Sequence, residues 1–134
     1  MNAKEFINTI YLGDRFCKRI VIDGWKERLG IQIDCISRLK KGTDTWNYYT
    51  DEDIYNGWLV FSGLRSVSAM PSGPIPNDSL EIMYAKESEG AHVFDISIGS
   101  VDETGRITEV RVDITAKQIS LETNEEFLAL LNEQ

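Results

Sequence analysis

The segment from residue 46 to residue 61 holds the chain's densest group of side chains suited to chemistry or recognition. Six aromatic residues there surround three consecutive carboxylates, Asp51, Glu52 and Asp53. Clustered carboxylates suggest a calcium loop, but the EF-hand pattern counted from Asp51 fails, because Tyr55 occupies the fifth position, where an acid or amide is needed. We therefore assign no metal and no cofactor to this segment.

Catalysis by histidine or cysteine is not indicated. The single histidine, His92, begins an expected strand, and the sequence places no nucleophile beside it. Cys17 and Cys35 lack the spacing of a metal or redox motif, and we expect two buried free thiols, as in a reducing compartment. Nucleotide-binding glycine motifs and the G-x-S-x-G elbow do not occur. A non-enzymatic role is favoured, and an enzyme that uses carboxylates or tyrosines is the third alternative.

Protein binding is the function that the aromatic and acidic segment favours. Tyrosine and tryptophan provide large contact areas at interfaces, and carboxylates steer a basic partner, either a basic protein or a toxin domain. The expected protein-binding residues are Trp46, Tyr48, Tyr49, Asp51, Glu52, Asp53 and Tyr55. Alternatively the aromatic rings pack inside the fold, and we expect Phe61 and one tryptophan to be buried.

Size and charge limit the choice of partners. The chain has 134 residues, which fits a single domain over 1–134, and its net charge is −8. This charge argues against nucleic acid and anionic membranes, which are themselves polyanions. The first residues lack the pattern of a signal peptide, and no apolar run is long enough to span a membrane. We expect a cytoplasmic protein.

Alternation of apolar and polar residues predicts most of the secondary structure. The expected strands are 15–23, 29–38, 57–63, 64–70 with a kink at Gly63, 92–101, 106–117 and a short edge strand at 118–122. Residues 3–11, capped near Gly13, and 123–134 are expected to be helices. The prolines make 71–78 a turn, and 79–87 is ambiguous between strand and helix.

These elements predict a mainly β fold, an antiparallel sandwich or open barrel with short N-terminal and C-terminal helices. Phe16, Ile20 and Ile22 are expected on the inner face of the first strand. The strand at 118–122, at the edge of its sheet, is one that pairs between chains if the protein forms a homo-oligomer. A β fold of this kind also allows a second function, a small-ligand carrier with an apolar pocket lined by Trp58, Phe61, Phe94 and Ile96.

Four stretches in order, "YLGDRFCKRIVIDGW", "IQIDCISR", "WNYYTDEDIYNGWLVFSG" and "PSGPIPND", resemble a family of small bacterial proteins of unknown function. The resemblance covers the chain from about Tyr11 to Leu121 and implies no activity. The layout of strands is also similar to that of some immunity proteins of bacterial polymorphic toxin systems. That likeness implies a small cytoplasmic antitoxin that binds and blocks a toxin domain.

Overall fold

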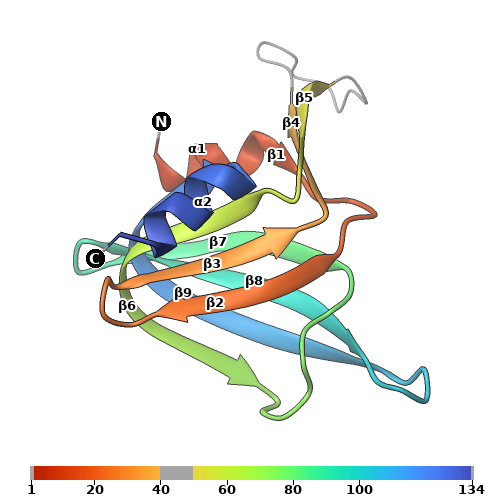
Figure 1. The fold of residues 1–134 in the computed structure, drawn as a ribbon. Coiled ribbons are helices and arrows are strands. Elements are labelled where there is room, and N and C mark those ends of the chain that lie inside the picture. Colours follow the sequence, from red (N-terminus) through yellow and green to blue (C-terminus); the bar gives the residue numbers. More distant parts are fainter. Residues whose placement is uncertain (1, 40–49, 134) are drawn as a thin grey trace.

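The computed structural model describes the backbone of residues 2–39 and 50–133 and the side chains of residues 2–38 and 53–133. These residues form two antiparallel sheets and two short helices (Figure 1), which confirms the expected mainly β fold. The larger sheet has the order β2-β3-β6-β9-β8-β7, and the smaller has the order β1-β4-β5. The larger sheet contains β2 (Cys17–Asp23), β3 (Arg28–Ile33), β6 (Trp58–Met70), β7 (Leu80–Ser88), β8 (Ala91–Val101) and β9 (Ile107–Glu122). The smaller contains β1 (Ile10–Tyr11), β4 (Cys35–Leu39) and β5 (Thr50–Tyr55).

Strand β9 lies in the middle of the larger sheet. It pairs with β8 from Ile107 to Ala116, and with β6 from Arg111 to Glu122, where Leu121 lies opposite Leu59. The expected hairpins β2–β3 and β8–β9 are both present. The expected separate strand at 118–122 is wrong, because these residues continue β9. They pair with the first half of β6, and β8 pairs with β9 only as far as Ala116.

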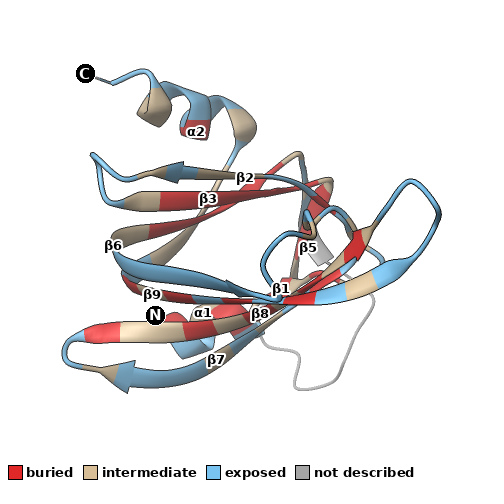
Figure 2. Ribbon diagram, turned by 90° about the horizontal axis from the view of Figure 1, so that it is seen from below, coloured by how far each residue is buried: buried red, intermediate tan, exposed pale blue. Residues whose placement is uncertain are grey.

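One face of the larger sheet carries the main core under one helix, and the second helix covers part of the other face (Figure 2). Helix α1 (Ala3–Asn8) and the strands β1 and β4 cover the face that carries the main core. Helix α2 (Asn124–Leu131) covers the other face over β3 and β6. The main core includes Leu29, Ile31, Ile33, Ile36, Phe61, Phe94, Ile96, Ile98, Val112 and Ile114.

Helix α2 is held by a cap and by one aromatic contact. The Thr123 hydroxyl accepts a hydrogen bond from the Glu126 N–H, and the Glu126 carboxylate accepts one from the Thr123 N–H, which is a capping box. Phe127 stacks on Trp58 with their ring centroids 4.1 Å apart. Gly30 lies beneath these rings, where a Cβ atom would come within 2.5 Å of the Phe127 ring. Glycine is therefore required for α2 to lie this close to the sheet.

The first helix ends earlier than the sequence predicts. Helix α1 is capped at Thr9, and Ile10–Tyr11 then pair with Arg38 and Ser37 of β4. The expectation of a helix that reaches Tyr11 and is capped near Gly13 is wrong, because tertiary pairing outweighs the helical spacing of the apolar residues.

Strand β2 departs from simple alternation. Its register shifts between Cys17 and Arg19, so Cys17 enters the main core together with Ile20. Phe16, just before the shift, is 45% exposed, and Ile22 is 57% exposed on the free edge strand. The expectation that Phe16 faces inward is wrong, because the bulge separates its side of the strand from that of Ile20. Ile22 shares the face of Ile20 and of its partner Leu29, as expected, but it is exposed because β2 is the edge strand of the sheet.

Strand β6 has two different halves. Trp58 and Phe61 are both buried, as expected, but on opposite faces, Trp58 under α2 and Phe61 in the main core. Gly63 adopts a φ of 63°, and the pairing register with β9 shifts between Leu64 and Ser66. The expected kink is thus a bulge within one long strand, and beyond it the side chains from Arg65 to Met70 are exposed.

Candidate interaction surface on the β4–β5 arm

Strands β4 and β5 form an arm that projects from the larger sheet (Figure 1). A bend at Asp34 transfers the chain from β3 to β4, and hydrogen bonds fix that bend. The Asp34 carboxylate accepts from the Phe16 N–H at 2.8 Å, and its carbonyl accepts from the Asn56 N–H at 2.9 Å. The arm is therefore anchored at its base to both β2 and the turn that precedes β6.

One face of the arm is apolar and turns toward the main core. Ile36 is fully buried and pairs with the half-buried Ile54. Gly57 lies beside this pair, and a Cβ atom there would approach the Ile54 side chain to 2.9 Å. This tight contact sets the angle at which β5 leads into β6.

The opposite face carries a polar relay from a cation to a carboxylate. An Arg15 nitrogen donates to the Ser37 hydroxyl at 2.9 Å, and Ser37 donates to the Asp53 carboxylate at 2.7 Å. The Arg15 guanidinium lies 6.0 Å from the centre of the Tyr11 ring, and its Nε has no hydrogen-bond partner among the described residues. Ser37 is almost completely buried. The relay orients the carboxylate and balances its charge, so Asp53 is a positioned acceptor and not a freely moving steering charge.

Tyr55 completes this face of the arm. Tyr55 pairs with Cys35, and Asp53 pairs with Ser37 two positions along, so the two β5 side chains lie on the same face. Tyr55 is 70% exposed, whereas Cys35 opposite it is buried. An exposed ring next to an oriented carboxylate on an edge strand is an arrangement suited to protein contact.

The structure thus brings two of the expected protein-binding residues, Asp53 and Tyr55, onto one surface. Asp51 and Glu52 belong to β5, and their side chains lie outside the described residues, as do Trp46, Tyr48 and Tyr49 altogether. Sequence reasoning missed Arg15 and Ser37. Their role depends on a strand pairing that no local pattern in the sequence predicts.

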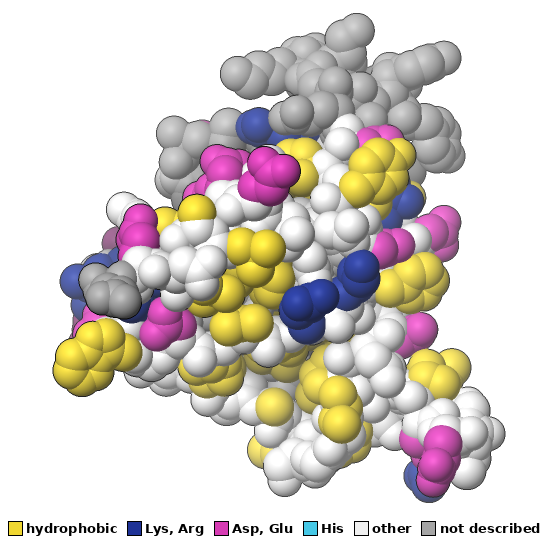
Figure 3. Space-filling view, in the orientation of Figure 1, with side chains coloured by type: hydrophobic (Ala, Val, Ile, Leu, Met, Phe, Trp, Pro, Cys, Tyr) yellow, Lys and Arg dark blue, Asp and Glu magenta, His cyan; other side chains and the backbone are white. Residues whose placement is uncertain are grey.

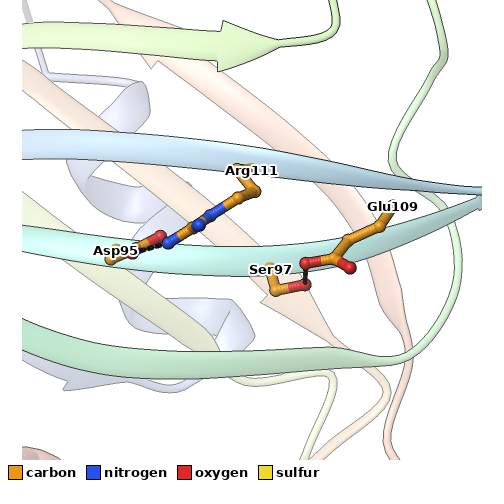
Figure 4. Close-up of polar contacts among 4 residues, drawn as sticks. All are labelled: Asp95, Ser97, Glu109 and Arg111. Atoms are coloured by element: carbon orange, nitrogen blue, oxygen red, sulfur yellow. Dashed lines mark hydrogen bonds and ion pairs between the residues drawn. The ribbon is translucent and has the colours of Figure 1, made fainter.

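A second polar group lies on the exposed face of β8 and β9 (Figure 4). Arg111 pairs with Asp95 across the two strands, and Ser97 donates to Glu109 at 2.8 Å. These residues line a shallow depression of about 260 Å³, and Asp95 raises the pKa of Arg111. Ion pairs on an open sheet surface contribute little, and here both carboxylates already have partners. We read this group as a solvated face of the sheet.

Two other reactive side chains, Cys17 and His92, are engaged within the fold. Burial raises the pKa of the Cys17 thiol to about 11, which keeps it protonated at neutral pH. The half-buried His92 lies 2.9 Å from the Tyr84 hydroxyl, so its ring nitrogen is already engaged. Both cysteines are free and buried, as expected. In the described part of the chain, no three His, Cys, Asp or Glu side chains group in a way that would hold a metal ion.

On the face drawn in Figure 3, apolar side chains appear at several places among charged and polar ones. Trp25, in the turn between β2 and β3, is 92% exposed. Among the described residues, no helix is long and apolar enough to cross a membrane.

A comparison with known protein families identifies the family of this chain. Its residues 1–128 match the model of a family described as Family of unknown function (DUF6258). The chain belongs to this family. Membership confirms the resemblance seen in the sequence, and because the family has no assigned activity, it transfers no residue role. No curated protein and no solved structure matches the chain.

Proposed function

We propose that this member of the DUF6258 family is a non-enzymatic protein-binding module that recognises a basic protein through the arm. The carrying observation is Tyr55, which is 70% exposed on the edge strand β5, on the same face as the oriented carboxylate of Asp53. An aromatic anchor beside a fixed hydrogen-bond acceptor costs little entropy to bring into contact.

Charge supports a basic partner. The chain carries a net charge of −8, so its field attracts cationic surfaces and repels anionic ones. The Asp53 carboxylate accepts a hydrogen bond from Ser37, and this bond holds its orientation at the surface of the arm. An arginine or lysine of the partner would bind there in a geometry that already exists.

An immunity-like role in a bacterial cytoplasm fits these features. Immunity proteins bind and block a toxin domain, and a small acidic module with an exposed arm is suited to that task. The partner we propose is accordingly a basic toxin domain.

Ligand carriage is not favoured by the packing. The four side chains expected to line a pocket do not share one space, because Trp58 and Phe61 lie on opposite faces of β6. Trp58 stacks on Phe127, and Phe61 contacts Phe94 with ring centroids 5.1 Å apart. Neighbouring side chains thus occupy the space that a ligand would need.

The test begins with the genes beside the coding sequence: the product of any toxin-like gene found there is purified and titrated against this protein. We expect Tyr55→Ala to weaken binding by about thirtyfold, the loss of roughly 2 kcal/mol that is usual for an interface anchor. Trp25→Ala is the matched control, because it removes an even more exposed ring in the β2–β3 turn, which lies away from the arm (Figure 1). It should leave the affinity unchanged.

Asp53→Asn tests the charge separately. The amide oxygen can still accept from Ser37, so the arm should keep its shape while the association rate falls, most strongly at low salt. Equal affinities for the wild type, Tyr55→Ala and Asp53→Asn would contradict the arm as the binding surface. A neighbouring product that does not bind at all would contradict the proposed partner.

A further inference from the structure

The second half of β6 is a strand edge without a partner. Strand β3 pairs with β6 only as far as Ser62, and the β2–β3 turn adds one more bond, from the Leu64 N–H to the Glu27 carbonyl. From Ser66 to Met70, β6 pairs with β9 alone among the described residues. Figure 1 shows this part of β6 separating from the β2–β3 hairpin and running beside β9. One row of its backbone N–H and C=O groups is therefore available to another strand.

This edge lacks the charges that usually protect such strands. The stretch from Ser66 to Met70 contains no charged residue and no proline. The outer strands of the same sheet are protected, β2 by Lys18 and Arg19, and β7 by Lys86 and Glu87. The surface at the end of β6 is apolar and uncharged in the lower part of Figure 3. In a chain with 27% charged residues, an exposed neutral edge favours contact with another strand.

We propose that a second copy of this chain pairs with this edge, antiparallel and about a two-fold axis at Ser68, to form one continuous sheet. A two-fold axis perpendicular to the sheet keeps the two faces of both copies aligned. Val67 then lies opposite Ala69 of the second copy on the core side, and Ser66 lies opposite Met70 on the outer side. No charged side chains face each other within the pair.

Charge explains why the second copy is the expected occupant. Two molecules of net charge −8 repel each other, so a contact between copies is favoured where it adds no like charges of its own. The stretch from Ser66 to Met70 meets that condition, and Pro71 ends it by removing the next backbone donor. A basic partner would gain nothing from this neutral edge and would be drawn to acidic surfaces instead.

The experiment measures the mass of the full chain in solution over a wide concentration range by light scattering and sedimentation. We expect a monomer–dimer equilibrium in the wild type. Ser68→Lys and Ser68→Glu each place two like charges opposite each other at the axis, and each should weaken the dimer about fivefold. A mixture of the two variants should form a mixed dimer more strongly than either variant alone, because opposite charges then meet.

Met83→Lys is the matched control, since it adds the same charge to an exposed position on the other edge strand, β7. It should leave the dimer unchanged. Hydrogen exchange of the wild type gives a second readout that needs no variant, with protection between Ser66 and Met70 rising with concentration. A wild type that stays monomeric, or a dimer that both Ser68 variants leave intact, would overturn the proposal.

Discussion

At the scale of residues, ionisation of the Cys17 thiol changes the stability of the whole fold. It is 3% exposed in the main core, and burial raises its pKa from 9.0 to about 11, an effect that a hydrogen bond from the Arg19 backbone partly offsets. The folded state thus holds the thiol proton more tightly than the unfolded state does. The stability that follows is complete below the unfolded pKa and is lost as the pH rises through the folded pKa.

The free energy of unfolding should therefore fall between about pH 9 and pH 11, by about 2 to 3 kcal/mol from this thiol. The measurement is urea unfolding of the wild type and Cys17→Ala on both sides of that window. The variant loses packing but has no thiol to ionise, so its deficit relative to the wild type should shrink as the pH rises. A deficit that stays constant across the window would show that Cys17 does not titrate in this way.

At the scale of elements, the sequence predicted helix α2 but did not predict the β4–β5 arm. Thr123 followed by Glu126 is a local capping signal, and the structure uses it directly. The alternation in β8 and β9 likewise predicted the burial of Phe94 and Ile96. In contrast, the run from Leu29 to Cys35 alternates, and only the adjacent apolar pair Cys35 and Ile36 breaks the pattern next to Asp34, where the chain passes between sheets. We expected one continuous strand there.

Thr123→Ala should destabilise the protein by about 1 kcal/mol, because it removes the acceptor that caps α2. The same bonds lower the pKa of Glu126, so its contribution is present at neutral pH and is lost as the pH falls through the lowered pKa. Urea unfolding measures the change. Asn2→Ala, which removes the side-chain cap of α1, is the control for a cap on a shorter helix. A Thr123→Ala protein as stable as the wild type would mean that packing of Phe127 alone holds α2.

At the scale of the molecule, the two proposed contacts have opposite electrostatics. The arm presents a carboxylate to a basic partner, whereas the edge of β6 joins two copies of the same acidic chain. Added salt screens both the attraction and the repulsion. The sequence predicted the acidic character and the aromatic segment, but only the pairing of strands separates the arm from the neutral edge.

Raising the salt concentration should thus weaken binding of the basic partner and strengthen the dimer. In matched buffers, titration calorimetry measures the dissociation constant of the partner and sedimentation measures that of the dimer. The two slopes are those of each constant against the salt concentration. The partner's slope should become shallower in Asp53→Asn, and the dimer's slope should not change in that variant. Slopes of the same sign would mean that one of the two contacts has been assigned the wrong charge character.

The pairing of β6 with β9 has a consequence for the order in which the chain folds. Hairpins β2–β3, β7–β8 and β8–β9 each join neighbouring segments, so they close short loops. The ladder between β6 and β9 instead joins Trp58 to Glu122 and Met70 to Arg111, across the whole β7–β8 hairpin. Closing such a distant contact carries the larger loss of chain entropy and comes late. Until the β6–β9 ladder forms, the apolar side chains of β6 stay exposed to water. The newly made chain is most prone to aggregation at that stage.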